Sequence, residues 1–294
     1  MADLIDSWDD VPKALEPAAP MTGPFPTGPF LEAWRRHRIA PDVAALIAVS
    51  ATAAVPLWIE QGVVRLSGEA DLTDYHSPLG GVLDECMALV ARRYSGADFS
   101  FDSLPCESVK PLVSALSAAG VPSASCPHGA TLVIDLPADH EAWLGSLSKK
   151  RRHEIRRKRR RFAESLGDPL LERRTDPEAF DAFITMHRSS QHDKGEFMTE
   201  AMERFFWTLI TDAGAAVDLL SVAGTPVAAA FVFTDTDALY LYNSSYAEDA
   251  SDASPGIVLL TSMIERSIED GVRRFDFLKG DEQYKYRLGA IDRP

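Results

Sequence analysis

Cysteine is scarce in this chain of 294 residues, which contains only Cys86, Cys106 and Cys126. An odd number excludes a complete disulfide framework, and none of the three has the CxxC spacing of a zinc or redox site. The sequence therefore predicts reduced thiols in a cytoplasmic protein.

Long apolar segments are also lacking. The N-terminus, MADLIDSWDD, is acidic and has no basic region before an apolar stretch, so it does not have the pattern of a secretory signal. The longest uncharged run, residues 43–59, is short for a membrane span and is interrupted by Pro56. Two buried strands explain this run better, and we expect no membrane insertion.

The signatures of several enzyme classes are missing. The chain has neither the G-x-S-x-G string of serine hydrolases nor a GxxxxGK[ST] phosphate loop. His187, His192 and Asp193 have poor spacing for metal ligands and no evident further ligand, so we expect no metal site.

Positive charge is concentrated in one segment. The net charge is −14, yet residues 149–161 contain ten Lys or Arg and one acid, a charge of +9 that leaves −23 for the rest of the chain. This asymmetry indicates a polyanionic partner or a localised phosphate site, and a solvated helix face is the simpler alternative. The spacing predicts a helix with Arg152, Arg156 and Arg159 on one face. An apolar seam toward the protein would consist of Ile155, Phe162 and Leu166.

The two halves of the chain repeat one order of predicted elements. Each has three strands, an acidic loop, a helix opened by Ser-Pro and a closing strand. The first set comprises residues 45–50, 54–60, 63–67, 79–94 and 97–104. The second comprises residues 216–224, 225–233, 238–245, 256–271 and 273–278.

This repeat predicts an α/β (α+β) protein with two tandem domains, each a mixed sheet flanked by helices, joined by the basic helix. The expected parts are an irregular N-terminal segment, a first domain, a basic linking helix and a second domain. Their ranges are 1–28, 29–140, 141–167 and 168–294.

Three strings resemble the GCN5-related N-acetyltransferase (GNAT) superfamily, in particular its tandem CelD-like or BioF-like group. They are residues 148–152, 186–197 and 275–289, the last reading FDFLKGDEQYKYRLG. The resemblance is good over about residues 140–290 and mostly topological before them. The same architecture is similar to that of Fem-type transferases, which use aminoacyl-tRNA as donor.

The resemblance implies two tandem GNAT-like domains that form an amide by transferring an acyl group to an amine acceptor, with acyl-CoA as the default donor. Two alternatives stay open. One is an aminoacyl-tRNA-dependent transferase acting on a peptidoglycan precursor or small peptide, with tRNA on the basic helix. The other is a non-catalytic nucleic-acid-binding protein.

Acyl-CoA enzymes of this fold normally bind the CoA pyrophosphate with an Arg/Gln-x-x-Gly-x-Gly/Ala turn at the start of a helix. The chain has one weak match to this turn, at residues 65–70, and we expect a loop and not a helix to follow it.

The C-terminal string supplies the candidate catalytic residues, Asp281, Glu282, Tyr284 and Lys285. Asp281 or Glu282 could take the amine proton, and the resemblance places Lys285 beside the acceptor and the acyl group. Tyr284 and Tyr286 alternate as in a strand, so we expect one of them in the core. A salt-bridged strand end is the alternative explanation.

Two further sets of residues are predicted to bind substrate. The candidate phosphate-binding residues are Lys149, Arg152, Arg156, Arg159, Lys279 and Gly280. The residues predicted to line an acceptor cleft are Tyr75, His187, Lys194 and Phe197. For the cleft residues after position 186, a plain surface loop is an equally good explanation.

Overall fold

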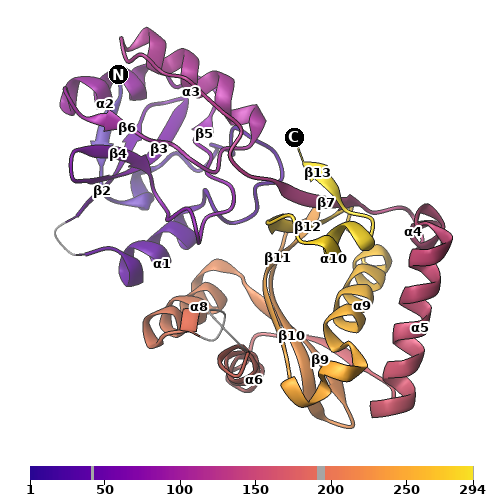
Figure 1. Ribbon diagram of the computed structural model, residues 1–294. Coiled ribbons are helices and arrows are strands. Elements are labelled where there is room, and N and C mark those ends of the chain that lie inside the picture. The colour runs from indigo at the N-terminus through magenta and orange to yellow at the C-terminus, as the bar shows by residue number, and fades with distance from the viewer. Residues whose placement is uncertain (41–42, 191–195, 294) are drawn as a thin grey trace. The chain divides into compact units, whose positions relative to one another are not determined.

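The computed structural model describes residues 1–40, 43–190 and 196–293. The chain divides into unit 1, Met1–Gly129, and unit 2, Ala130–Arg293 (Figure 1). Each unit is built around its own sheet with helices packed on it, so the predicted α/β class with two sheets flanked by helices is confirmed. Within the three described ranges, no helix is long and apolar enough to cross a membrane.

Unit 1 contains a sheet in the order β1-β2-β3-β4-β6, with the short β5 paired to β3. Its strands are β1 (Asp3–Ile5), β2 (Ala44–Val49), β3 (Ala53–Glu60), β4 (Val63–Leu66), β5 (Leu79–Gly80) and β6 (Asp98–Phe99). Its helices are the 3-10 turn η1 (Trp8–Asp10), α1 (Gly28–Arg38), α2 (Asp84–Arg93) and α3 (Cys106–Ala118). Val55, Leu57, Met87 and Leu112 are among the residues that join α2 and α3 to the sheet in one apolar core.

The predicted start of the first helix is wrong. The helix α2 begins at Asp84, because Leu79 and Gly80 instead form β5 and Gly80 has φ +75°, outside the helical range. The Ser77 hydroxyl donates to the carbonyl of Pro78 at 2.9 Å, so it is not used as a helix cap.

Unit 2 contains a seven-stranded sheet in the order β13-β7-β12-β11-β10-β9-β8. The strands are β7 (Thr131–Asp135), β8 (Leu170–Arg174), β9 (Ala216–Val222), β10 (Thr225–Thr234), β11 (Ala238–Tyr246), β12 (Arg274–Lys279) and β13 (Ile291–Arg293). The helices are α4 (His140–Ser146), α5 (Lys149–Leu166), α6 (Pro177–Arg188), α8 (Glu200–Ala213), the 3-10 segment η2 (Glu248–Ala253), α9 (Pro255–Glu269) and α10 (Gln283–Arg287). Helices α6 and α8 cover one face of the sheet, and α9 with α5 outside it covers the other (Figure 1).

Both units have the same connectivity. In unit 1, β2, β3 and β4 pair antiparallel in succession, α2 follows, and β6 pairs parallel to β4. In unit 2, β9, β10 and β11 pair antiparallel, α9 follows, and β12 pairs parallel to β11. The predicted internal repeat is therefore confirmed. The second Ser-Pro prediction is also correct, since α9 begins at Pro255, although the side chain of Ser254 makes no cap.

The basic helix is confirmed as α5, whose N-cap Ser148 accepts a hydrogen bond from the backbone of Arg151. It packs against α9 and η2 within unit 2. Ile155 and Phe162 are buried, whereas Leu166 is 36% exposed in the last turn. The predicted seam is therefore wrong at Leu166, because the helix ends there without returning to the core.

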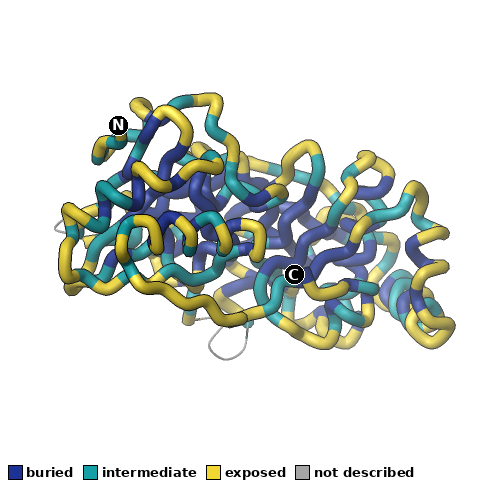
Figure 2. The backbone as a smooth tube through the Cα atoms, turned by 90° about the horizontal axis from the view of Figure 1, so that it is seen from above, coloured by how far each residue is buried: buried dark blue, intermediate teal, exposed yellow. Residues whose placement is uncertain are grey.

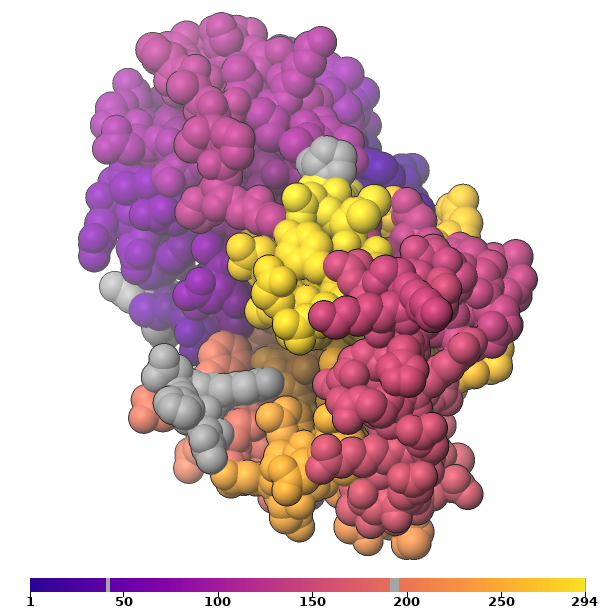
Figure 3. All heavy atoms as spheres, turned by 45° about the vertical axis from the view of Figure 1, so that its right-hand side comes forward, coloured from indigo at the N-terminus to yellow at the C-terminus, as the bar shows by residue number. Residues whose placement is uncertain are grey.

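Burial follows the sheets. Figure 2 shows buried residues gathered in the interior and exposed residues toward the outside, and β9 and β10 are buried at most positions. In unit 2 the edge of the sheet comes from distant parts of the chain, because β7 pairs antiparallel with both β12 and β13. Figure 3 shows the C-terminal residues, in yellow, beside α4, where the Trp143 indole N–H donates to the carbonyl of Leu288 at 3.1 Å.

Candidate functional site

The parallel pair β11 and β12 separates part-way along unit 2. The ladder joins Ala238–Tyr240 to Arg274–Asp276 and then ends, although β11 continues to Tyr246 and β12 to Lys279. A register shift between Phe231 and Val232 marks a bulge in the pairing of β10 with β11. Such irregularities re-aim strands and often lie beside active sites. The ends of β11 and β12 are therefore the place where unit 2 can admit a substrate.

The end of β12 has a bent backbone. Leu278 has φ +58° and Gly280 has φ +102°, and the pairing with β7 shifts register between Asp276 and Lys279. Asp276 is fully buried, and its Oδ1 accepts from the backbone N–H of Leu278 at 2.8 Å. The guanidinium of Arg293 lies 3.9 Å from the other carboxylate oxygen. A buried ion pair thus supports the bend.

Lys285 lies beneath this bend and not at the surface. Only 3% of its side chain is exposed. Its Nζ donates to the carbonyls of Lys279 at 2.6 Å and Gly280 at 3.1 Å, and it pairs with Oε2 of Glu282 at 2.8 Å. The structure therefore brings together four residues of the predicted site, but it turns Lys285 toward the protein.

The rest of the C-terminal string is helical. Gln283–Arg287 form α10, so the predicted strand alternation of Tyr284 and Tyr286 is wrong. Burial raises the pKa of Tyr284, whose ring contacts Phe277. The Tyr286 hydroxyl donates to Asp292 at 2.8 Å, and this hydrogen bond raises the pKa of Tyr286. Neither phenol is therefore placed as a ready base.

Two carboxylates of the predicted site remain accessible. Asp281 is exposed, and the side chain of Glu282 is 55% exposed at the N-cap of α10. Of the two, Glu282 has a defined position because Lys285 holds one of its oxygens. Within the described ranges, the side chain of Asp281 makes no hydrogen bond or ion pair that would fix it in the same way.

The predicted phosphate-binding face of α5 is mostly occupied by contacts within the protein. Arg152 donates to the carbonyls of Gly145 and Leu147, at 3.1 and 2.6 Å. Arg156 pairs with Glu141 at 3.5 Å, and Arg159 pairs with Glu265 of α9 at 2.9 Å. Arg152 and Arg159 are thus partly engaged within the protein, whereas Arg156 stays exposed, and the phosphate-binding role of this face remains a prediction. Seven cationic side chains of α5 are exposed: Lys149, Lys150, Arg151, Arg156, Arg157, Arg160 and Arg161.

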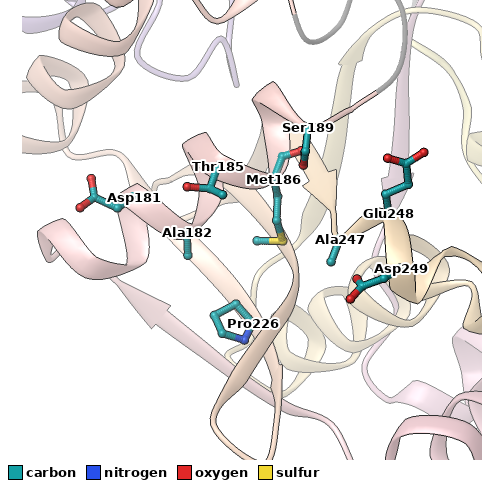
Figure 4. A pocket seen from close by; sticks show the side chains of 9 residues that line it. All are labelled: Asp181, Ala182, Thr185, Met186, Ser189, Pro226, Ala247, Glu248 and Asp249. Carbon is teal, nitrogen blue, oxygen red and sulfur yellow. The ribbon is translucent and has the colours of Figure 1, made fainter.

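An open depression of about 770 Å³ lies where β11 ends, against α6 (Figure 4). Met186, Pro226 and Ala247 supply apolar surface, and carboxylates enter from two sides, Asp181 from α6 and Glu248 and Asp249 from η2. The remaining lining residues are Ala182, Thr185 and Ser189. The sequence showed an acidic loop at residues 246–253 but gave no sign that α6 would face it.

Of the predicted acceptor-cleft residues, His187 and Phe197 lie together, but in an aromatic cluster. His187 is fully buried and its ring contacts those of Phe183 and Phe197, so it lies in an aromatic cluster. Phe197 is half-buried in the same cluster. Tyr75 is 2% exposed in the core of unit 1, where its ring contacts Phe25. Lys194 lies outside the described residues.

The weak pyrophosphate string at residues 65–70 has no helix after it, as expected. Gly68 is packed so closely that a side-chain carbon there would lie 2.2 Å from the Thr73 hydroxyl oxygen. This segment therefore has no open phosphate-binding turn. Across the three described ranges, no group of His, Cys, Asp and Glu could hold a metal ion.

Comparison with known proteins gives a family for unit 2. Residues 149–286 match the family model described as an acetyltransferase (GNAT) domain. This segment is therefore similar to GNAT domains. The match contains α5, the separating strands β11 and β12, and the C-terminal string as far as Tyr286. No curated protein matches the chain.

Solved structures show the same fold over both units. FemX superposes with a TM-score of 0.61 at 12% identity, covering 96% of this chain and 91% of FemX. A conserved protein of unknown function from Bacteroides thetaiotaomicron gives 0.61 at 13% identity, covering 89% and 85%. The C-terminal domain of a putative lysylphosphatidylglycerol synthetase from Agrobacterium fabrum gives 0.56 at 14%, covering 90% and 89%. The family-model match supports an acyltransferase in general, and the solved structures support the fold.

Proposed function

We propose that this protein is an N-acyltransferase that moves an acyl group from acyl-CoA to an amine acceptor. The observation that carries the proposal is the separation of β11 and β12 after Tyr240 and Asp276, within the segment that matches the GNAT family model. Two parallel strands that part in this way expose backbone amides able to hold and polarise an acyl carbonyl. Because both acyl-CoA and charged tRNA are made in the cytoplasm, we place the reaction there.

The reaction requires little covalent machinery. The amine nitrogen attacks the thioester carbonyl carbon, the new C–N bond forms, and the C–S bond breaks to release the CoA thiolate. One proton leaves the amine nitrogen and one is taken up by the thiolate, so a single accessible carboxylate can serve both steps. Asp281 and Glu282 supply accessible carboxylates at the end of β12.

The donor phosphates need a cationic surface, and the start of α9 does not provide it. Three acids precede this helix in η2, namely Glu248, Asp249 and Asp252. Helix α5 packs against η2 and carries the exposed cations, including the predicted phosphate-binding residue Lys149. We therefore assign the phosphate-binding role to α5.

The same surface favours a second candidate, transfer of an aminoacyl group from charged tRNA. The exposed cations extend from Lys149 to Arg161, about 18 Å along the helix at 1.5 Å per residue. A nucleic-acid backbone can engage such a row, whereas one CoA molecule carries few phosphates. In this case the acceptor would be a peptidoglycan precursor or a small peptide.

Thermal-shift titration at fixed salt separates the two donors. We expect acetyl-CoA to raise the melting temperature with saturation, because a ligand that binds only the folded state stabilises it by about 2.7 kcal/mol at 100 times its Kd. Free CoA should act similarly, and bulk charged tRNA should have no effect. A shift with tRNA alone that fades as salt rises would instead support the aminoacyl donor.

Charge-reversal variants test whether α5 is the surface that binds the donor phosphates. Lys150→Glu combined with Arg161→Glu should reduce whichever shift is seen, because both residues are exposed on α5. Arg204→Glu, an exposed arginine of α8, changes the charge elsewhere in unit 2 and serves as the control. An equal reduction of the ligand-induced shift in the α5 double variant and in Arg204→Glu would refute the role of α5. Binding of tRNA without any amide product would indicate the non-catalytic alternative.

A further inference from the structure

The ammonium group of Lys285 has no donor left for a substrate. An ammonium carries three N–H donors. Lys285 uses them on the carbonyls of Lys279 and Gly280 and on the carboxylate of Glu282, at 2.6, 3.1 and 2.8 Å. With 3% of its side chain exposed, it also has no open path to bulk solvent. A direct role beside the acyl group would require at least one of these contacts to break.

We propose that Lys285 is a positioning residue and that Glu282 is the carboxylate that meets the acceptor amine. This inference rests on the proposed acyl transfer and assigns separate roles to these two residues of its site. It differs from the role that the family resemblance implies for Lys285, because here the cation acts through Glu282 and the end of β12.

The two oxygens of Glu282 are in different situations. Lys285 holds Oε2, which fixes the side chain, while the side chain as a whole is 55% exposed. In the described part of the chain Oε1 accepts no hydrogen bond, so this oxygen can take a proton from an incoming amine. A carboxylate with one anchored oxygen and one accessible oxygen has the geometry that a general base requires.

Gly280 provides the space in which this carboxylate lies. A side-chain carbon at position 280 would be 2.5 Å from Oε2 of Glu282, far inside contact distance. The φ of +102° also favours glycine at this position. Gly280 therefore leaves the space that the Glu282 carboxylate occupies, and Lys285 holds the carboxylate there through the ion pair.

Hydrogen bonds from neighbouring elements of unit 2 hold the backbone on both sides of Glu282 and Lys285. The backbone N–H of Gly280 donates to the carbonyl of Ala130 of unit 2 at 3.1 Å. Asp276 holds the backbone of Leu278, and Trp143 holds the carbonyl that follows α10. Because the supports come from several elements of unit 2, removing the Lys285 contacts should free Glu282 locally and leave the sheet intact.

In the reaction, Oε1 of Glu282 takes one proton from the amine nitrogen as the C–N bond forms. The C–S bond then breaks, and the same proton passes to the departing CoA thiolate. Lys285 keeps its three protons throughout and makes no bond to either substrate.

Steady-state kinetics of the full chain test these roles, with acetyl-CoA as donor and glycinamide, ethanolamine and Nα-acetyl-lysine as acceptor probes. Glu282→Gln should lower kcat at least 100-fold while the KM for acetyl-CoA changes less than twofold, since general bases contribute about 10²–10⁴. Formate should restore part of the kcat of Glu282→Ala by supplying a carboxylate. Lys285→Met should also lower kcat, and formate should not restore it.

Arg287→Met is the matched control, because it removes an exposed cation from the same helix and should leave kcat unchanged. If Lys285→Met fails to fold, Gly280→Ala takes its place, since it keeps both charges but displaces Glu282. An active wild type whose kcat survives Glu282→Gln overturns the inference and leaves the proposed function standing. No amide from the wild type with any acceptor overturns the proposed function and the role of Glu282.

A second measurement examines Lys285 without any substrate. With ¹⁵N-lysine labelling, its ammonium should give a slowly exchanging N–H signal that is absent from Lys285→Met and shifted in Glu282→Gln. Exchange as fast as that of exposed lysines would overturn the positioning role whatever the activity.

Discussion

Replacing Phe162 with alanine should destabilise unit 2 by about 3–5 kcal/mol. Phe162 is 0% exposed and, with Ile155, is one of two buried residues among the eighteen of α5. Removal of a buried aromatic side chain costs this amount because the transfer free energy is lost and a cavity remains. The ring lies in the same apolar core as Ala253 and Val258, so its loss should also loosen α5 from η2 and α9.

Urea and thermal denaturation followed by circular dichroism measure this loss. For a cooperative unit of about this length, each kcal/mol lowers the melting temperature by about 2–4 °C, so the expected decrease is about 6–20 °C. Leu166→Ala is the control, because Leu166 is on the same helix but 36% exposed, and its effect should stay within about 0.5 kcal/mol. A loss below about 1 kcal/mol for Phe162→Ala, or equal losses for both variants, would refute the docking of α5 through Phe162.

Two further predictions concern buried polar groups of unit 2. Arg173→Met leaves Asp218, which is fully buried, without its bidentate partner at 2.8 Å, and should cost about 3–5 kcal/mol in urea unfolding at pH 7. A loss below about 1 kcal/mol would show that the carboxylate finds another partner. Because burial raises the pKa of Tyr284 in the folded state, stability is complete below about pH 10, the unfolded value, and falls as the pH rises beyond it. Tyr284→Phe should reduce this alkaline loss in unfolding measured from pH 8 to 12, and an unchanged loss would contradict the assignment.

Local patterns in the sequence were sufficient for the repeated elements. Alternation and apolar periodicity placed β9, β10, β11, α9 and the basic helix within a few residues, because each has its signal within its own segment. The start of α2 was misplaced because Ser77-Pro78 carries a helix-start pattern that tertiary pairing of Leu79 with β3 overrides. The strands β7 and β13 gave little signal, since both are short and their pairing partners lie far away in the chain.

The candidate site shows the same limit at the level of single residues. Sequence reasoning identified the string that contains Glu282 and Lys285, because both residues are near one bend in the chain. It could not tell which of the two faces the protein. That depends on whether α10 is a helix, since only a helical step brings Lys285 back to Glu282 and to the carbonyls at the end of β12. Read as a strand, the same residues point Lys285 outward.

The distribution of charge at the starts of two helices supports the proposal that α5, and not α9, binds the donor phosphates. A helix N-terminus carries a partial positive charge, so acids before it are favourable and cations in its first turn are unfavourable by about 0.3–1 kcal/mol each. The acids of η2, Glu248, Asp249 and Asp252, precede α9 and satisfy its dipole from within the chain. Helix α5 has the opposite arrangement, since its first turn holds Lys149 and the cations after it, with no acid. That arrangement does not stabilise the folded helix. A bound anion would offset the repulsion between these cations and the positive helix start, because the anion is attracted by both.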